Sequence, residues 1–432
     1  MDKIVIDGGV PLHGTLSASG AKNAALPILF ATLLAPGEHR IANMPKLVDV
    51  SETLSLLGRI GCPSLAGSTT RIDTSRVVFC EAPYDVVRKM RASVLVLGPL
   101  LAREGTARVS LPGGCAIGVR PIDQHLKGLE ALGCRFELEG GYVNGSTDGL
   151  RGAEIHLDVP TVTGTENIVM AAVLADGTSV IHNAAKEPEV ADVCRFLTTL
   201  GARIEGIGTS TLTIDGVARL SPASRPYRIV PDRIETGTYL CAAATAGGDL
   251  EVLETDPTLI TAVTEKLTEA GCTVEIGPRS VRVRREGPLH PIEVATAAYP
   301  GFPTDMQAQL MTVACMAEGR SVITETIFEN RFMHAAELGR MGAHIETQGN
   351  VATVHGTGRL MSSPVMASDL RASAALVLAG LAAEGLTEVL RIYHLDRGYE
   401  DMVGKLRGVG ARIGRVSDEV RDEARLQQAL SA

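Results

Sequence analysis

The residues best suited to chemistry lie on one glycine-rich segment in the first third of the chain. There Cys115, Arg120 and Asp123 place a thiol, a guanidinium group and a carboxylate within nine residues of one another, beside glycines at positions 113, 114 and 118. Glycine lets a backbone move and approach a ligand closely, and a nearby cation lowers the pKa of a thiol. The segment therefore predicts a mobile lid that carries a reactive cysteine.

The alternative role of Cys115 is structural, because most free cysteines are buried and pack as small hydrophobic side chains. The chain has eight cysteines, and none of them belongs to a CxxC pair. This spacing predicts neither a zinc site nor a disulfide framework. The residues alone leave Cys115 open between the structural and the reactive role.

A second group of candidates consists of cations at the expected beginnings of helices. They are Lys22, Arg91, Arg120, Arg331, Arg371 and Arg397. A cation there opposes the positive end of the helix dipole, so the repeated placement predicts a bound anion that cations and helix ends share. Asp305 and Asp369 stand in comparable positions and are candidate general bases. A simpler role, as helix N-caps, accounts for Thr163, Thr304, Ser368 and Asp396.

The elements that must position these residues repeat along the chain. One series of glycines ends amphipathic helices at positions 61, 133, 201, 271, 342 and 410, and a second closes apolar helices at positions 37, 105, 177, 248, 319 and 385. Each repeat of about seventy residues combines a buried apolar helix, an amphipathic helix and several short strands. Six repeats predict an α/β fold of two domains, each with three βαβαββ-type repeats, helices buried and sheets outside.

Composition narrows the range of partners. The net charge is −9, and only 3% of the residues are aromatic, with no tryptophan. These values argue against a nucleic acid or an anionic membrane as the main partner. The N-terminus lacks the pattern of a secretory signal, and apolar runs such as 24–35 are too short to span a bilayer. We expect a cytoplasmic protein whose partners are small anionic molecules.

Several longer motifs resemble those of a known family. They are SGAKNAALP at 19–27, LPGGCAIG at 111–118, RPID at 120–123, PDRIETG at 231–237, PGFPTDMQAQ at 300–309, FENRF at 328–332, SDLR at 368–371 and LDRGY at 395–399. The chain resembles the enolpyruvyl transferases, and among them the enzymes that act on UDP-N-acetylglucosamine. The resemblance runs from Met1 to about Val416.

The resemblance implies a fold and a reaction. The fold is two inside-out α/β domains with the active site in the cleft between them. The first domain is expected at 22–229, the second at 1–21 and 230–417, and a C-terminal tail at 418–432. The implied reaction moves an enolpyruvyl group from phosphoenolpyruvate to the 3′-hydroxyl of UDP-N-acetylglucosamine and releases phosphate, as the first committed step of peptidoglycan synthesis. Neither a metal ion nor an organic cofactor is implied.

The same resemblance implies residue roles. Cys115 would protonate the methylene carbon of phosphoenolpyruvate, and Asp305 would take the proton of the attacking hydroxyl. Phosphate would be held by Lys22, Arg120 and Arg397. Arg91 and Arg371 would neutralise carboxylate and phosphate, and Arg331 and Asp369 would support the reacting centre. Contacts to the UDP-sugar are implied for Asn23, Arg120, Pro121, Ile122, Asp123, Thr163, Gly164 and Ile327.

Two departures and two rival functions accompany this interpretation. Gln124 stands where leucine is common, and Val119 replaces a usual alanine of the lid, so uracil packing and lid closure are expected to differ. One rival is the enolpyruvyl transferase of the shikimate pathway, which shares fold and donor. The other is a non-catalytic sensor of UDP-sugars. The lid cysteine and the 120–123 segment favour the UDP-sugar enzyme, and the intact catalytic set disfavours a sensor.

The lid cysteine yields a first prediction. Epoxide phosphonates of the fosfomycin type are expected to inactivate the protein, because a reactive Cys115 thiolate would open the epoxide and form a carbon–sulfur bond. Residual enolpyruvyl transfer after increasing times of preincubation measures this. Full activity after prolonged exposure would contradict the role given to Cys115.

Overall fold

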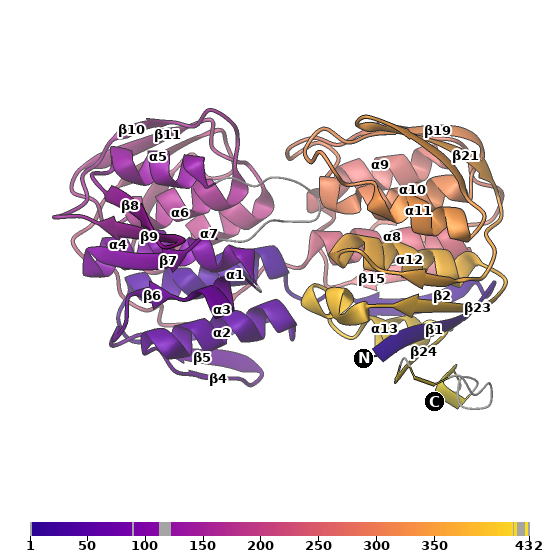
Figure 1. Cartoon of the computed structure of the whole chain (residues 1–432), viewed down its shortest axis with the longest axis horizontal. Coiled ribbons are helices and arrows are strands. Elements are labelled where there is room, and N and C mark those ends of the chain that lie inside the picture. The colour runs from indigo at the N-terminus through magenta and orange to yellow at the C-terminus, as the bar shows by residue number, and fades with distance from the viewer. Residues whose placement is uncertain (1, 89, 112–121, 418, 421–427, 431–432) are drawn as a thin grey trace. The chain divides into compact units, whose positions relative to one another are not determined.

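The computed structural model describes residues 2–88, 90–111, 122–417, 419–420 and 428–430. These residues form six four-stranded sheets, which confirms the predicted sixfold repeat. The chain divides near Ser19 and Val230 into two domains. Domain I comprises the described residues from Gly20 to Val230, and domain II comprises residues 2–19 together with those from Pro231 onward (Figure 1).

Domain I contains the first three repeats. Repeat one consists of β14 (Tyr227–Arg228), α1 (Lys22–Ala31), η1 (Thr32–Leu34), β3 (Glu38–Ala42), α2 (Val48–Ile60), β4 (Ser64–Leu65) and β5 (Thr69–Asp73). Repeat two consists of β6 (Glu81–Ala82), α3 (Tyr84–Val87), η2 (Arg91–Val96), α4 (Leu97–Glu104), β7 (Thr106–Ser110), α5 (Asp123–Ala131), β8 (Arg135–Glu139) and β9 (Tyr142–Ser146). Repeat three consists of β10 (Glu154–His156), α6 (Val162–Ala172), β11 (Thr178–His182), α7 (Pro188–Thr199), β12 (Arg203–Glu205) and β13 (Thr211–Asp215).

Domain II contains the other three repeats. Repeat four consists of β2 (Leu12–Ser17), α8 (Arg233–Ala246), β15 (Gly248–Leu253), η3 (Pro257–Leu259), α9 (Thr261–Glu269), β16 (Thr273–Ile276) and β17 (Ser280–Arg285). Repeat five consists of β18 (Glu293–Ala295), η4 (Thr304–Met306), α10 (Gln307–Cys315), β19 (Glu318–Thr324), α11 (Met333–Arg340), β20 (His344–Gln348) and β21 (Val351–Thr357). Repeat six consists of β22 (Pro364–Met366), α12 (Leu370–Ala382), β23 (Gly385–Leu390), η5 (Ile392–Arg397), α13 (Met402–Arg407), β24 (Arg412–Ser417) and β1 (Asp2–Gly8).

Every sheet has the same topology: from one edge to the other, a parallel pair of strands is followed by two antiparallel pairs. In repeat three, β10 pairs with β11 in parallel, whereas β13 pairs antiparallel with both β11 and β12. Two sheets are completed by strands that lie far from the rest of the sheet in sequence. The N-terminal β1 pairs with β23 and β24, and β14, near the middle of the chain, pairs with β3. Long-range pairing therefore completes both sheets.

Each domain has its own hydrophobic core around the first helix of every repeat. Helix α12 is buried from Arg371 to Leu381, and α6 from Gly164 to Ala172. Beyond its first turn α12 is apolar on all sides, whereas α6 also buries the polar side chains of Thr165, Glu166 and Asn167. Only the interior of a domain accommodates helices that are buried all round. The second helices are amphipathic, and α2 places Leu56, Leu57 and Ile60 in the core. The prediction of buried helices under outer sheets is confirmed.

Glycines with a left-handed backbone terminate the repeated elements. All glycines of both series have positive φ, from 73° at Gly105 to 138° at Gly37. Gly61 is the C-cap of α2, with φ of 110°. A residue with a Cβ atom is strained in this region, which explains why glycine recurs at these turns. None of the described helices is long and apolar enough to cross a membrane.

Described residues of the tail lie on the outer face of β1. Leu430 packs against Val5, whose side chain is fully buried and points away from the main core of domain II. The Lys3 ammonium, also buried, donates to Glu388 Oε1 at 2.7 Å and to the Val420 carbonyl at 2.9 Å. This part of the expected surface tail therefore covers a sheet face.

The second glycine series leads to a prediction about stability. A Cβ atom at Gly248 (φ 113°) would lie 2.0 Å from the Leu12 carbonyl oxygen, where β15 pairs with β2. We expect Gly248→Ala to lower the free energy of unfolding by about 2 kcal/mol or more, measured by urea denaturation. Gly339→Ala is the matched control, because nothing lies within 4 Å of its added Cβ atom. The control is expected to be neutral or stabilising by up to ~1 kcal/mol, since alanine favours a helix; equal losses would contradict the argument.

Candidate active site

The start of α12 is organised by Asp369. Its Oδ1 atom accepts hydrogen bonds from the backbone amides of Arg371 at 2.9 Å and Ala372 at 3.0 Å. Asp369 is thus the N-cap, and the expectation that Ser368 has this role is wrong, because the helix begins one residue later than its motif indicates. Ser368 instead donates its hydroxyl to Asp369 Oδ2 at 3.1 Å. The capping carboxylate positions Arg371 in the first turn.

Asp305 lies between two arginines that are far from it in sequence. Arg331 Nη2 donates to Asp305 Oδ1 at 2.7 Å, and Arg371 donates to Oδ2 through Nε at 3.1 Å and Nη2 at 2.8 Å. Both guanidinium groups are buried, whereas 27% of the Asp305 side chain is exposed. We call this group, together with Thr304 and Glu325, the Asp305 cluster. The structure therefore brings together three of the predicted site residues.

The electrostatics of the cluster keep Asp305 ionised. Burial alone would raise the pKa of its carboxyl, but the charges and hydrogen bonds of Arg371 and Arg331 outweigh burial and hold this pKa well below its ordinary value. Charge-assisted bonds of this kind are stronger than bonds between neutral groups. Asp305 is consequently a fixed carboxylate and, in this arrangement, a weak base.

Thr304 and Glu325 hold Arg331 through a chain of two hydrogen bonds. Arg331 Nη1 donates to the Thr304 hydroxyl at 2.7 Å, and this hydroxyl donates to Glu325 Oε2 at 2.8 Å. Glu325 Oε1 also accepts the backbone amide of Ile327 at 2.9 Å. The sequence prediction assigned no role to Glu325, although an acidic residue directly after strand β19 was a usable signal. Thr304 does not cap a helix with its side chain, because η4 has Pro303 at its N-cap.

One donor of the cluster remains available. Arg371 is almost fully buried, and its Nη1 atom has no hydrogen-bond partner among the described residues. A buried polar group without a partner costs free energy, so Nη1 is well suited to donate to a bound anion. His334, buried nearby, also has an unpartnered Nε2 within the described part of the chain. Burial lowers the pKa of His334 to about 4, so its ring is neutral at physiological pH.

Arg397 differs from its predicted position. It is the last residue of η5, not the beginning of the next helix, which starts at Met402 behind an Asp401 N-cap. A cation at this helix end agrees with the dipole, so its placement does not by itself indicate an anion. Asp396 is not a cap either, because its carboxylate pairs with Arg415 at 2.8 and 2.9 Å. Arg397 is half-buried. The pKa of His394 is lowered mainly by the burial of its own ring and to a smaller degree by the charge of Arg397.

In domain I, α1 begins directly with Lys22. The N-cap position is Ala21, which offers no side-chain acceptor to the first amides of the helix. Lys22 Nζ lies 3.3 Å from Asp49 Oδ2, with 12% of the Lys22 side chain exposed. Asn23 follows, half-buried. A cation in the first turn of a helix without a side-chain cap is the arrangement that the sequence predicted for anion binding.

A second group of polar residues in domain I is the His125 cluster, formed by His125, Thr163 and Asn167. The Asn167 amide oxygen accepts from the Gly98 amide at 2.7 Å, and its nitrogen lies 3.0 Å from both the Val94 carbonyl and His125 Nδ1. Because this nitrogen can only donate, Nδ1 is the acceptor and the proton is on Nε2. His125 Nε2 therefore donates to the Thr163 hydroxyl at 3.2 Å.

This tautomer has a consequence for Thr163. Burial, and to a smaller degree the charge of Arg91, lower the pKa of His125 to about 4, so the ring is neutral at physiological pH. The Thr163 oxygen accepts from the ring, which leaves the hydroxyl hydrogen free to donate elsewhere. The sequence predicted Thr163 as the N-cap of α6, and this prediction is wrong. The cap is Thr161, whose hydroxyl accepts a hydrogen bond from the Gly164 amide at 3.3 Å.

Other predicted contacts lie at the start of α5, which begins at Asp123 behind Ile122. Gln124 is buried and donates to Asp123 Oδ2 and to Asp158 Oδ2, both at 2.9 Å. Its amide oxygen also accepts the Asp158 backbone amide at 2.9 Å. The residue that replaces the usual leucine thus joins the helix start to the segment that follows β10. Ile327, in domain II, is exposed.

Cys115, Arg120 and Pro121 lie outside the described residues. The other seven cysteines are free, and six of them are buried. Burial raises the pKa of the Cys62 and Cys272 thiols to about 11 and those of Cys134, Cys194 and Cys315 to about 12. A protonated, inaccessible thiol is not a nucleophile. These cysteines therefore follow the structural alternative considered for Cys115.

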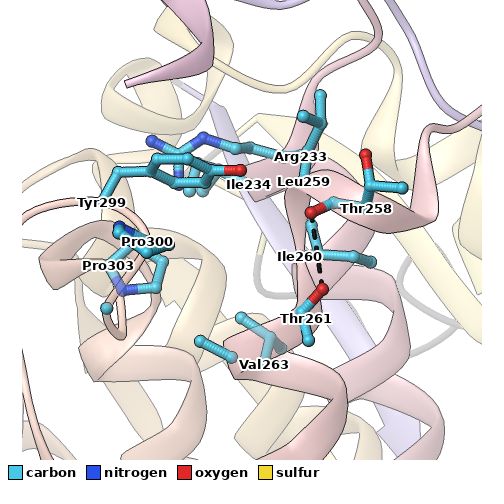
Figure 2. A pocket seen from close by; sticks show the side chains of 12 residues that line it. Arg233, Ile234, Thr258, Leu259, Ile260, Thr261, Val263, Tyr299, Pro300 and Pro303 are labelled. Atoms are coloured by element: carbon cyan, nitrogen blue, oxygen red, sulfur yellow. Dashed lines mark hydrogen bonds between the residues drawn. The ribbon is translucent and has the colours of Figure 1, made fainter. Parts of the chain in front are cut away.

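A small pocket in domain II lies beside the segment that leads to Asp305. The start of α8, the turn from η3 to α9 and residues 299–303 line it (Figure 2). Arg233 lies over the Tyr299 ring, 5.6 Å from its centroid. The cavity of about 60 Å³ has room for a few water molecules. No residue of the Asp305 cluster lines it, so it is not the centre of the site.

Solved structures define the class of fold. The enolpyruvyl transferase NikO from Streptomyces tendae is similar with a TM-score of 0.86 and 27% identity, covering 96% of this chain and 99% of the other. An EPSP synthase from Acinetobacter baumannii has the same fold, with a TM-score of 0.75, 17% identity and coverage of 96% and 100%. The sixfold repeat is thus the architecture of enolpyruvyl transferases.

The chain belongs to the family described as EPSP synthase (3-phosphoshikimate 1-carboxyvinyltransferase), which matches residues 6–406. Closer relatives carry another name. A UDP-N-acetylglucosamine 1-carboxyvinyltransferase from Anaeromyxobacter dehalogenans (strain 2CP-C) is 57% identical over 422 residues, 96% of this chain and all of the relative. One from Dichelobacter nodosus is 55% identical over 420 residues, 97% of this chain and all of the relative. The protein is therefore an enzyme of this family.

The Asp305 cluster leads to a prediction about pH. Asp305→Asn is expected to lower the free energy of unfolding by about 2–4 kcal/mol at neutral pH, because two buried guanidinium groups lose their anion. The folded-state pKa of Asp305 is depressed, so its stabilisation is complete above the unfolded value of about 3.9 and is lost as pH falls through the folded value. Urea denaturation of wild type and variant should give a constant difference between about pH 5 and pH 8.

The matched control is Asp85→Asn, which removes a carboxylate that pairs with Arg59 at 3.1 Å on the surface. Both partners are more than half exposed, so the change should stay within ~0.5 kcal/mol. A loss for Asp305→Asn no larger than that of the control would contradict the cluster.

Proposed function

We propose that the protein transfers the enolpyruvyl group of phosphoenolpyruvate to the 3′-hydroxyl of UDP-N-acetylglucosamine and releases phosphate, as the first committed step of peptidoglycan synthesis. The observation that carries this proposal is the identity of 55–57% to full-length relatives with that name. The free thiols of the described cysteines support a reducing, cytoplasmic location. Its partners are these two small molecules.

Anion binding is assigned to the cations at helix ends. Lys22 and the uncapped amides of α1 offer positive charge in domain I, and Arg371 offers its unpartnered Nη1 in domain II. Phosphoenolpyruvate carries both a phosphate and a carboxylate, so several donors are needed to balance it. We assign phosphate to Lys22, with Arg120 and Arg397, and the remaining charge to Arg91 and Arg371. Such fixed donors stabilise the charge that develops during transfer.

Asp305 is assigned the proton of the attacking 3′-hydroxyl. Held by Arg331 and Arg371, it accepts hydrogen bonds well but is a weak base. Phosphoenolpyruvate is an anion that competes for the same guanidinium groups, so its binding draws positive charge from Asp305 and raises the basicity of the carboxylate. The base thus becomes effective only when the donor substrate is bound. Arg331 and Asp369 act as positioning residues, through Asp305 and the α12 cap.

The nucleotide is assigned to residues of domain I. The Thr163 hydroxyl has a hydrogen free to donate, because its oxygen accepts from His125. An acceptor such as the diphosphate suits this donor. The start of α5, with Ile122 and Asp123, is assigned to the uridine, together with Asn23, Pro121, Gly164 and Ile327 for the rest of the UDP-sugar. Cys115 supplies the proton that the methylene carbon gains.

Phosphate release tests this proposal. Wild-type protein is expected to release phosphate from phosphoenolpyruvate only when UDP-N-acetylglucosamine is present. Cys115→Ser and Asp305→Asn should each lower this rate by ~100-fold or more, because each removes a proton-transfer group. Cys80→Ser is the matched control, since Cys80 is a half-buried cysteine with no assigned role, and it should keep the wild-type rate.

The rival functions give different results in the same assay. Release that depends on shikimate 3-phosphate instead would identify the shikimate-pathway reaction, which the family description names. Tight binding of UDP-N-acetylglucosamine without release would indicate a sensor. Release that Cys115→Ser leaves unchanged would preserve the transfer reaction and remove the acid role of Cys115.

A further inference from the structure

Repeat three presents two histidines and a glutamate on the outer face of its sheet, outside all the residues assigned to the reaction. Glu154 and His156 are two residues apart on β10 and therefore share a face of the strand. His182 on β11 pairs directly with His156 in the parallel register. The intervening Ile155 and Ile181 point into the core. The sheet thus holds three ligating side chains on the same surface.

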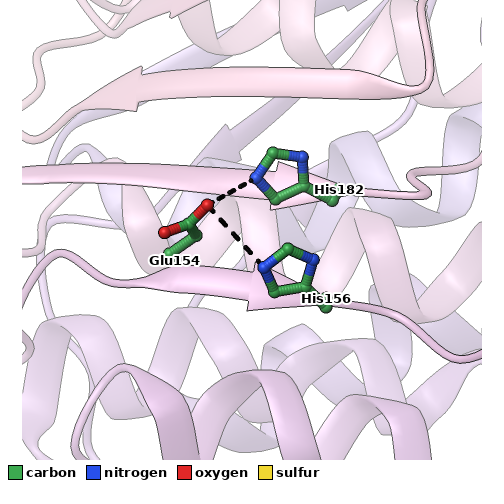
Figure 3. A group of neighbouring side chains, drawn as sticks. All are labelled: Glu154, His156 and His182. Carbon is green, nitrogen blue, oxygen red and sulfur yellow. Dashed lines mark hydrogen bonds and ion pairs between the residues drawn. The ribbon is translucent and has the colours of Figure 1, made fainter.

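The three side chains converge on one point (Figure 3). His182 Nε2 lies 3.0 Å from Glu154 Oε1, and His156 Nε2 lies 3.7 Å from the same oxygen. The two imidazole rings are stacked, with centroids 4.4 Å apart and planes 9° from parallel. A single hydrogen bond to Glu154 would need only one of the rings. The second ring presents its nitrogen to the same oxygen without reaching hydrogen-bonding distance.

This arrangement has the spacing of a metal site. The ligand atoms of the three residues all lie within 4.8 Å of one another. Ligands of a tetrahedral zinc ion, at about 2.0–2.2 Å from the metal, are about 3.3 Å apart. The contacts of 3.0 and 3.7 Å bracket this value. Glu154 and His156 are exposed and His182 is half-buried, so side-chain rotations can bring the three ligand atoms to this separation.

We propose that Glu154, His156 and His182 bind a borderline divalent cation such as Zn²⁺ or Cu²⁺. Imidazole nitrogens select this class of ion, and a carboxylate completes the set by adding negative charge. Three protein ligands leave one tetrahedral position for water. β10 is an edge strand of three residues, so the ion links it to its neighbour β11. Bound metal stabilises domain I by a free energy that grows with the logarithm of its concentration over its dissociation constant.

A second group of the same composition serves as an internal comparison. His344, Glu346 and His355 lie on β20 and β21, with nitrogen–oxygen distances of 3.4 and 3.7 Å. Their imidazole planes are 28° apart, and the centroids are 4.7 Å apart. The looser contacts and less parallel rings require a larger rearrangement to surround an ion. The site in repeat three is therefore expected to bind more tightly.

Equilibrium dialysis of chelator-treated protein against zinc tests the proposal. We expect tight uptake of one equivalent at about pH 7.5 and its loss at about pH 5.5, because imidazole binds metal only when deprotonated. Glu154→Gln, His156→Gln and His182→Gln should each weaken this uptake by about tenfold or more. With Cu²⁺ as the probe, electron paramagnetic resonance should show coupling to two nitrogens in wild type and to one in His156→Gln.

Matched variants identify the source of any binding. His344→Gln should leave the tight equivalent unchanged, and so should Cys115→Ser, which removes a competing thiol. The three ligand variants should keep the wild-type rate of phosphate release, because none of these residues is assigned to the reaction; this rate also shows that they fold. Uptake that all three variants retain would overturn the proposal. Absence of uptake at about 100 µM zinc would do the same.

Discussion

The structure depends on the burial of an apolar helix in every repeat. Beyond its first turn α12 has no polar face, so it is stable only when sheets and other helices surround it. The first turn is the exception, because its amides lack partners within the helix. Polar residues therefore concentrate where the buried helices begin. The Asp305 cluster, the His125 cluster and Lys22 all occupy such positions.

Electrostatics at these helix ends connect stability with chemistry. Two buried arginines share one carboxylate in Asp305, and one of their nitrogens has no partner within the described residues. The two arginine charges are balanced by Asp305 and Glu325, so the feature that favours an anionic ligand is this nitrogen, the buried Nη1 donor of Arg371. The two guanidinium groups also weaken Asp305 as a base. Thr304 and Glu325 limit the movement of Arg331, so the donors are oriented before any ligand arrives.

Several sheets are completed by strands that are distant in sequence from the rest of the sheet. β1 and β2 precede the first helix, yet both belong to sheets of domain II. β14, near the middle of the chain, completes the sheet of repeat one. Each domain is therefore built from segments distant in sequence, and its folding requires long-range pairing. Described tail residues then cover the outer face of β1, where Val5 would otherwise be exposed.

Local sequence patterns were sufficient to predict the repeat, the fold class and the residues that could form a site. Glycine spacing and helical apolarity are local signals, because positive φ and all-round burial constrain residue type at each position. Motif resemblance extended this to a family that the comparisons support. Helix boundaries were less accurate, and the caps proved to be Thr161, Asp369 and Asp401. The first two lie within two residues of the predicted Thr163 and Ser368, as expected where neighbouring polar residues compete for the cap. Asp401 lies further from the predicted Asp396, whose carboxylate pairs with Arg415.

Which candidate residues act together depends on contacts between elements that are distant in sequence. The contact between Asp305 and Arg371 joins residues 66 positions apart, and no local pattern specifies it. Glu325 and Asn167 have roles that depend on partners in other elements. Glu325 accepts the hydroxyl hydrogen of Thr304, which holds Arg331, and Asn167 determines which tautomer His125 adopts. Arg397 is not at the beginning of a helix, because α13 starts at Met402, so its position does not by itself indicate a bound anion. The pairing of His156 with His182 likewise depends on strand register, a long-range property that composition does not reveal.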